Sequence, residues 1–357
     1  MRRIVLALVV AFLATPVRVR ADEVELAGGT RVAGEVLERT DAGVRLLLPA
    51  GDEVTFAPAD VKKVTVLEGA PGGETFLRFV KDGPRPGLEV GVAHYVKAGA
   101  PRVDLVGAVH AADAAYFREV QAILDRDDVV LYEMVKKAGD DPWRKPTDAE
   151  REQSPISKFQ STIAKAFDLT FQLDEIDYRR RHFVHADMTA EEFLAKGGGA
   201  ITKEMASMIA KIGPLLDMVA RMMNPPDDAS AERKASARAM RTTVKGVLGA
   251  MLGASGGKAG GLLTGLGGDD LIIGQRNDVA IGVFDAQHQG ARSIAIFYGA
   301  AHMPDLEKRL LARGYVRAGG RWITAWDVSP PRAPAPAAPS TPAPAPPAAM
   351  DTEPVAR

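Results

Sequence analysis

The sequence predicts an α/β (α+β) protein, built as a mixed sheet with two Gly-x-x-His strand–turn–helix units, a helical insertion and a small N-terminal β-barrel. Three observations lead to this fold class. Apolar strand-like runs alternate with amphipathic helical patterns over residues 88–137 and 270–327. A long stretch of helical periodicity separates these two segments. Short alternating runs, bounded by turn residues, precede both of them.

Residues 1–21 have the layout of a secretory signal peptide. A basic pair at residues 2–3 precedes an apolar run at residues 4–13, and residues 19–21 fit a small-x-small cleavage site. The apolar run is short for a stable membrane anchor. An uncleaved anchor is the alternative interpretation, because Arg18 and Arg20 closely follow the run. We expect a periplasmic or secreted protein with no stable transmembrane anchor beyond the signal segment.

Residues 22–68 predict a small SH3-like β-barrel. They contain short alternating runs separated by turn residues, and the runs lie at 24–26, 31–37, 43–48, 53–56 and 61–66. Barrels of this kind usually serve as interaction or spacer units. A protein partner, if the chain has one, is therefore expected to bind through this barrel.

A larger domain is expected over residues 69–328. It opens with a Pro/Gly linker, and the runs at 75–80 and 88–95 then indicate paired strands. His94 alternates with apolar neighbours in the second run. This position favours a satisfied sheet histidine over a metal ligand.

The first motif of this domain lies in a strand–helix–strand unit. An apolar run at 103–106 leads into a Gly-x-x-His motif that ends on His110, an amphipathic helical pattern follows, and a second apolar run at 129–132 ends on Glu133. Such a unit makes its two strands parallel. His110 and Glu133 are therefore expected on one edge of the sheet, where open α/β sheets bind their ligands.

The second motif repeats the first half of this pattern. An apolar run at 293–298 is followed by a Gly-x-x-His motif that ends on His302, and Pro304 suits the first turn of the next helix. Either histidine alone could simply pack or cap locally. Together with Glu133, however, His110 and His302 form the ligand set of an open site for a divalent metal. The sequence does not distinguish manganese, cobalt and zinc.

A helical insertion is expected at about residues 138–268, because the spacing of apolar residues there is helical. Thr189 and Glu192 form a capping-box pattern at the start of one helix. Glycine recurs at every fourth position from residue 249 to residue 265. This pattern fits either a small-residue stripe for close helix packing or a glycine-rich loop that closes over the site. Residues 179–187 are a basic run before the helix cap at Thr189, which usually forms a solvated edge, although His185 and Asp187 could add a ligand or a substrate contact.

The end of the chain has two expected features. Residues 315–328 are expected to form a closing hairpin that turns at Gly319-Gly320. Beyond Val328 the chain is rich in Pro and Ala, which predicts a disordered tail at 329–357.

The two motifs, together with a few residues near each of them, resemble the TraB/GumN (TIKI-type) family. That family belongs to a superfamily that includes erythromycin-esterase-like and haem-binding ChaN-like proteins. The resemblance covers about residues 88–137 and 270–327 and rests on Gly107-x-x-His110, Tyr116, Glu133, Arg276-Asn277 and Gly299-x-x-His302. The family commonly has Glu-Arg-Asn where this chain has Gln275 before the arginine. A role for a charge at that position is therefore not expected here.

The resemblance implies a metal-dependent hydrolase that acts on a peptide or amide bond in a peptide or small-molecule substrate. His110, Glu133 and His302 would hold the metal. Arg276 would stabilise the developing oxyanion, and the residues expected near the substrate are Arg276, Asn277 and Tyr116. Asp113 or His185 is expected to orient the attacking water.

Two other classes remain open at this point. A haem- or ligand-binding protein of the ChaN-like kind would use the two histidines and Tyr116 as iron ligands. A non-catalytic structural module would keep the motifs without binding metal. Composition bears on the binding partner and on the chemistry. The net charge of −1 gives no reason to expect a nucleic acid as a binding partner. The absence of cysteine excludes disulfides and cysteine catalysis.

Overall fold

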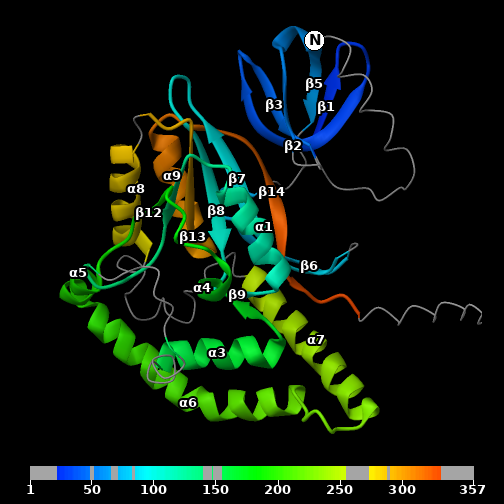
Figure 1. Cartoon of the computed structure of the whole chain (residues 1–357), viewed down its shortest axis with the longest axis vertical. Helices are drawn as coiled ribbons and strands as arrows, with labels where there is room; N and C mark the ends of the chain where they lie inside the picture. The colour runs from blue at the N-terminus through cyan, green and yellow to red at the C-terminus, as the bar shows by residue number, and fades with distance from the viewer. Residues whose placement is uncertain are drawn as a thin grey trace, which may run out of the picture.

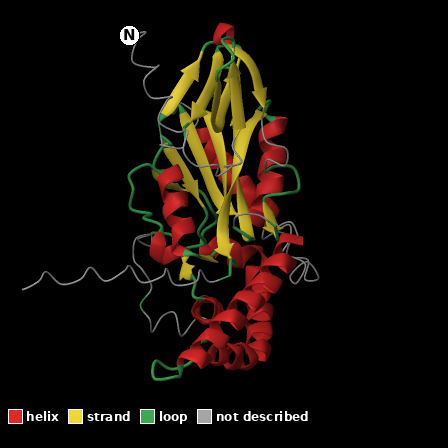
Figure 2. Cartoon of the chain, turned by 90° about the vertical axis from the view of Figure 1, so that its right-hand side faces the viewer, coloured by secondary structure: helices red, strands yellow, loops and turns green. Residues whose placement is uncertain are grey.

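The computed structural model describes residues 22–48, 52–65, 71–82, 85–139, 147, 155–254, 273–287 and 290–330. The expected signal peptide, most of the Pro/Ala-rich tail and residues 255–272 of the glycine-rich stretch lie outside these residues. The described chain is a mixed α/β structure (Figure 1). Figure 2 shows the strands of both large sheets together in its upper part and the long helices of the insertion gathered at its lower end.

An antiparallel five-stranded sheet forms the N-terminal part of the structure. Its order is β4-β3-β2-β1-β5, and its strands are β1 (Asp22–Leu26), β2 (Arg31–Thr40), β3 (Gly43–Leu47), β4 (Glu53–Phe56) and β5 (Val61–Thr65). These strands lie where the alternating runs predict them. Their inward positions supply a small apolar core that includes Val24, Val36 and Leu46. No pairing of β4 with β5 is seen among the described residues, so closure into a barrel stays a prediction.

A mixed seven-stranded sheet forms the centre of the molecule. Its order is β12-β10-β13-β8-β7-β14, with β6 also paired to β7. The strands are β6 (Leu77–Val80), β7 (Gly87–Val96), β8 (Arg102–Ala108), β10 (Val129–Tyr132), β12 (Phe183–His185), β13 (Ser293–Gly299) and β14 (Val316–Asp327). The neighbours β12, β10, β13 and β8 are parallel, whereas β6, β8 and β14 run antiparallel to β7.

Strand β13 joins the two motif-bearing halves of the domain into one sheet. It pairs with β8 from Ser293 opposite Arg102 to Gly299 opposite Ala108, and it pairs with β10 on its other side. All of β13 up to Tyr298 is buried. An unbroken apolar run is typical of a parallel strand that is covered on both faces. The expected placement of residues 293–298 beside 103–109 is confirmed.

Helices cover both faces of this sheet (Figure 1). Helix α1 (Ala114–Leu124) packs on one face through Tyr116, Phe117 and neighbouring apolar residues. Helices α8 (Gln275–Gln287) and α9 (Met303–Ala312) pack on the other. Pro304 lies in the first turn of α9, where its missing N–H removes no helical hydrogen bond.

The described part of the segment between β10 and α8 is largely helical. It contains α3 (Pro155–Phe167), β11 (Thr170–Phe171), α4 (Gln172–Glu175), α5 (Ala190–Phe193), a short π-helical turn (Leu194–Gly198), α6 (Gly199–Met223) and α7 (Ala231–Ala254). Thr189 and Glu192 form the expected capping box of α5. Within the described ranges, no helix is both long and apolar enough to cross a membrane.

Two sequence-based expectations about local structure are wrong. We expect residues 315–328 to form a hairpin that turns at Gly319-Gly320, but β14 is a single strand that pairs with β7 along its length. The glycines serve close packing instead. A Cβ atom at Gly319 would collide with the carbonyl of Val36 in β2, and one at Gly320 with the carbonyl of Val92 in β7.

The second wrong expectation concerns residues 179–187, which the sequence presents as a polar edge before a helix. Their centre forms β12, an edge strand of the main sheet that pairs with β10. The insertion therefore contributes a strand as well as helices. The short strand is hard to recognise in sequence because only Phe183 in it is fully buried.

Candidate functional site

Three of the predicted site residues follow the carboxyl ends of neighbouring parallel strands. His110 follows β8, Glu133 follows β10, and His302 follows β13 at the end of a short 3-10 turn, η7 (Ala300–His302). Because β10, β13 and β8 are adjacent and parallel, all three residues lie on one edge of the sheet. This is the edge expected from the strand–helix–strand pattern.

Glu133 is held through both of its carboxylate oxygens. Oε2 accepts a hydrogen bond of 2.6 Å from the backbone N–H of Gly299, and Oε1 accepts one of 2.6 Å from Nη2 of Arg276. Burial alone would raise the pKa of Glu133. The positive charge that His302 carries when it is protonated at low pH, the charge of Arg276 and the Gly299 N–H together outweigh burial and lower the pKa of Glu133 to about 2. Glu133 is therefore a carboxylate at neutral pH.

His302 is buried and is oriented by Asn277. Its Nδ1 lies 2.7 Å from Oδ1 of Asn277. The amide nitrogen of Asn277 donates to the carbonyl of His302 and to Asp305, which fixes which end of the amide faces the ring. An amide oxygen only accepts hydrogen bonds, so Nδ1 carries the proton. The lone pair of the neutral ring is consequently on Nε2.

The Nε2 atom of His302 faces Glu133 without a proton between them. It lies 3.6 Å from Oε1 of Glu133, which is longer than a hydrogen bond. Burial lowers the pKa of His302 and keeps the ring neutral, against the opposing field of Glu133. Two atoms with lone pairs thus face each other on the sheet edge. This is an electron-rich position that a cation would stabilise.

His110 is oriented in the same way by a residue from the insertion. Its Nδ1 donates to Oε1 of Gln172 over 3.1 Å, and the amide nitrogen of Gln172 donates to the hydroxyl of Tyr178. The backbone N–H of Gln172 also donates to the carbonyl of His110. The lone pair of His110 is therefore on Nε2 as well. The side chain is exposed on its loop.

The three residues do not form a closed ligand triad in this structure. Among the residues that the structure describes, no group of three His, Asp or Glu side chains is gathered closely enough to hold a metal ion. His302 and Glu133 are already close, whereas His110 is paired with Gln172. The three residues thus share one edge of the sheet without surrounding a single point.

Arg276 and Asn277 lie at the site but contact protein groups. The Arg276 side chain bridges two carboxylates, with Nε at 2.9 Å from Oδ1 of Asp187 and Nη2 in contact with Asp187 and Glu133. Asn277 is fully buried behind His302. In this arrangement both residues support the predicted ligands rather than face a substrate.

The remaining predicted site residues are engaged elsewhere. Asp113 forms an ion pair of 2.7 Å with Lys245 of α7 and accepts from the backbone N–H of Asp327. His185 donates from Nε2 to the carbonyl of Met134. Tyr116 is buried, and its hydroxyl donates to the carbonyl of Gly107. The structure brings none of these three side chains into contact with Glu133 or His302.

Gln172 and Asp187 are the site residues that the sequence did not single out for these roles. Asp187 follows β12 by two residues and so reaches the same sheet edge as Glu133. Recognition of β12 as a strand would have placed Asp187 there. Gln172 has no comparable signal, because its position depends on the pairing of β11 with the two-residue strand β9 (Ala111–Ala112) directly after His110.

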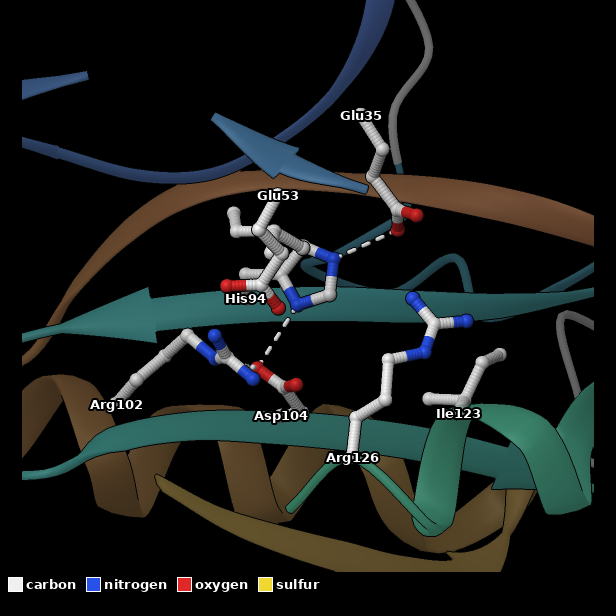
Figure 3. A pocket seen from close by; sticks show the side chains of 8 residues that line it. Glu35, Glu53, His94, Arg102, Asp104, Ile123 and Arg126 are labelled. Carbon is white, nitrogen blue, oxygen red and sulfur yellow. Dashed lines mark hydrogen bonds and ion pairs between the residues drawn. The ribbon is translucent and has the colours of Figure 1, made fainter. Parts of the chain in front are cut away.

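A second cluster of charged side chains lies at the other end of these strands, between the two large sheets (Figure 3). Nδ1 of His94 is 2.8 Å from Asp104 on β8, and Nε2 is 2.7 Å from Glu35 on β2. Arg102 donates to Asp104. His94 is thus a satisfied sheet histidine, as expected. The cluster joins the N-terminal sheet to the central one.

Comparisons with known proteins leave the functional assignment to the site itself. No family model matches the chain, and no significant match is found among curated proteins or among solved structures.

Proposed function

We propose that this protein is an exported metal-dependent hydrolase that cleaves a peptide or amide bond. One observation carries the proposal. His110 and His302 are distant in sequence, yet each donates its Nδ1 proton to a side-chain amide oxygen and leaves the Nε2 lone pair free. Proteins commonly fix the tautomer and ring plane of metal-binding histidines by a hydrogen bond of this kind to the second ring nitrogen.

The donor set fits a divalent metal ion. His110 and His302 each offer an imidazole Nε2, and Glu133 offers a carboxylate held at both oxygens. Manganese, cobalt and zinc all accept this combination of ligands. An ion bound by these residues would polarise the scissile carbonyl and lower the pKa of its bound water. The exposed position of His110 gives a peptide or small-molecule substrate access to the site.

The surrounding residues act on the ligands in this proposal. Asn277 and Gln172 set the tautomers of the two histidines, and Arg276 holds the Glu133 carboxylate. Asp113 is paired with Lys245, and His185 is hydrogen-bonded to the Met134 carbonyl. These contacts favour neither residue as the one that orients the attacking water. Export, the relation to TraB/GumN proteins and closure of the N-terminal barrel belong to the same proposal, because they rest on the sequence patterns.

The haem-binding alternative receives less support from the geometry. Tyr116, its third expected iron ligand, is 1% exposed and uses its hydroxyl proton in a hydrogen bond to the Gly107 carbonyl. Release of that hydroxyl would require opening the packing of α1 against the sheet. The metal-dependent hydrolase is therefore the function that the site supports best.

Metal binding by the purified protein tests the proposal. Elemental analysis and calorimetric titration with Mn²⁺, Co²⁺ and Zn²⁺ should show one bound ion per chain. His110→Ala and His302→Ala should each lose most of the affinity, and the double variant should lose little more, because the second change acts on a site already broken. His182→Ala is the matched control, since that ring contacts the Leu124 carbonyl at the other end of the sheet.

Two results would contradict the hydrolase. A Soret absorption band from bound haem would favour the binding protein. Unchanged ion binding by both histidine variants, or no binding of any of the three ions by the wild type, would favour the structural module.

A further inference from the structure

Asp187 is a buried carboxylate that none of the proposed chemistry uses directly. Its side chain is 0% exposed. Oδ1 accepts from Nε of Arg276 at 2.9 Å and from the backbone N–H of Met188 at 2.7 Å, and Oδ2 accepts from Nη2 of Arg276 at 2.5 Å. An ionised group in such a place is costly unless it is paired, so its contact with Arg276 is obligatory.

We propose that Asp187 is a positioning residue that acts through Arg276 to hold Glu133 ready for a metal ion. The inference rests on the proposed function in taking Glu133 as a ligand. The guanidinium is planar and rigid, and Asp187 binds it in the two-pronged manner that fixes its plane. Fixing that plane also fixes the direction of Nη2, whose other contact is Oε1 of Glu133 at 2.6 Å.

Glu133 is consequently held from two independent directions. The backbone N–H of Gly299 on β13 holds Oε2, and the Asp187–Arg276 pair holds Oε1. The first contact is built into the sheet. The second depends on a carboxylate supplied by the segment after β12, which belongs to the insertion. Asp187 thus connects the insertion to the geometry of the site.

Asp187 also adjusts the charge at the site. A single guanidinium facing Glu133 alone would neutralise its carboxylate and compete with a cation for it. With Asp187 present, two carboxylates share one guanidinium, and the cluster keeps a net negative charge. A divalent cation is therefore attracted to Glu133 even though Arg276 is hydrogen-bonded to it.

A double-mutant cycle separates this role from simple core stability. The variants are Asp187→Asn, Arg276→Lys and their combination, titrated with Mn²⁺, Co²⁺ and Zn²⁺. Asp187→Asn should weaken binding by roughly 10- to 100-fold, the usual effect of losing a group that orients a metal ligand. Lysine keeps the charge of Arg276 but lacks the planar fork that Asp187 grips through Nε and Nη2, so Asp187 can no longer fix the direction of the donor to Glu133. In the Arg276→Lys background, Asp187→Asn should therefore cost little more affinity.

The matched control is Asp127→Asn. Asp127 carries a buried carboxyl group that contacts Arg102 at 3.3 Å, near the opposite edge of the same strands. This variant should leave ion affinity at the wild-type value and should not couple to Arg276→Lys. An equal loss of affinity in Asp127→Asn, additive losses in the cycle, or wild-type affinity in Asp187→Asn would each overturn the proposal. If Asp187→Asn does not fold, wild-type affinity in Arg276→Lys alone would overturn it.

A second readout distinguishes failure of this inference from failure of the proposed function. In ¹⁵N-labelled protein without metal, the Nε–H of Arg276 should give a resolved, slowly exchanging NMR signal, because it is buried against Asp187. Asp187→Asn should speed its exchange or shift the signal, and Asp127→Asn should not. If the wild type binds no ion, the proposed function fails while this signal still reports on the Asp187–Arg276 contact. An Arg276 signal that is unchanged in Asp187→Asn would contradict the contact itself.

Discussion

At the scale of single residues, the site is defined by which nitrogen of each histidine carries its proton. In both motif histidines the proton is on Nδ1, because the side-chain amide oxygen of Gln172 or Asn277 accepts a hydrogen bond from that atom. Asn277 is itself fixed, because its amide nitrogen is occupied by the His302 carbonyl and by Asp305. The two residues of the Arg-Asn pair therefore support different side chains. Arg276 donates a hydrogen bond to Glu133, and Asn277 accepts one from His302.

Asn277→Ala should weaken ion binding by about 10-fold or more, because His302 would lose the partner that fixes its tautomer and ring plane. Calorimetric titration with the ion that binds the wild type most tightly measures this effect. Asn224→Ala is the control, since the Asn224 amide caps the end of α6 and contacts two backbone carbonyls and Arg241, away from the site. Equal affinity in the Asn277→Ala protein and the wild type would contradict the role given to the amide.

The sequence was sufficient to place the three proposed ligands on one sheet edge, but it did not identify the residues that support them. His110, Glu133 and His302 each follow an apolar run that forms a strand, so local pattern alone places them on one edge. The partners Gln172 and Asp187 come from the insertion, and their positions depend on the pairing of β9 with β11 and of β10 with β12. Such short strands leave almost no periodicity to detect, and only tertiary contacts decide them.

At the scale of elements, α7 shows why glycine recurs in the insertion. Gly249 and Gly253 face β6, where a Cβ atom at Gly253 would collide with the backbone at Phe79. Within the described part of the chain, the small-residue stripe is therefore a packing surface on a helix. The later glycines of the repeat lie outside the described residues. Glycine has the same role in β14, where Gly319 and Gly320 let β2 and β7 approach closely. In the sequence, this glycine pair resembles a turn.

Gly253→Ala and Gly246→Ala should change stability in opposite directions. At Gly253 the added methyl group meets fixed backbone, and overpacking of this kind should destabilise the fold by about 1–3 kcal/mol. At Gly246 of the same helix nothing lies within 4 Å of an added Cβ, so alanine should stabilise the helix by about 0.5–1 kcal/mol. Urea unfolding of the two variants measures both effects. Stabilisation of the Gly253→Ala protein would show that α7 does not pack closely on β6.

At the scale of the whole molecule, the charged cluster around His94 couples the two large sheets. Burial by itself would lower the pKa of His94. Asp104 and Glu35, which contact the two ring nitrogens, outweigh burial and raise its pKa to about 10. The pKa of Glu35 is lowered despite burial by the same contacts. The imidazolium therefore links a carboxylate of the N-terminal sheet to one of the central sheet.

This linkage predicts a loss of stability at alkaline pH. A histidine whose pKa is raised from 6.5 on folding contributes its full stabilisation below pH 6.5, and the contribution is lost as the pH rises toward about 10. His94→Gln should therefore lower the free energy of unfolding by about 2 kcal/mol at pH 6, because Asp104 and Glu35 lose the charged hydrogen-bond donor that they share while keeping their ion pairs with Arg102 and Arg321. The difference between wild type and variant should shrink between pH 7 and pH 10. Urea unfolding at a series of pH values measures the difference, and a constant difference would mean that His94 is neutral in the folded protein.

The place of β13 in the central sheet has a further consequence for how the chain acquires its fold. β13 lies between β8 and β10, yet it is the last of the three to be synthesised. Until residue 299 has been synthesised, β8 and β10 cannot pair with the strand that lies between them. The helical segment that precedes β13 in the chain is also synthesised before that strand. Contacts over such sequence separations make folding slow and leave open strand edges in the meantime. A chain released before β13 should therefore be prone to aggregation, and a chaperone that delays folding until synthesis is complete should raise the yield of native protein.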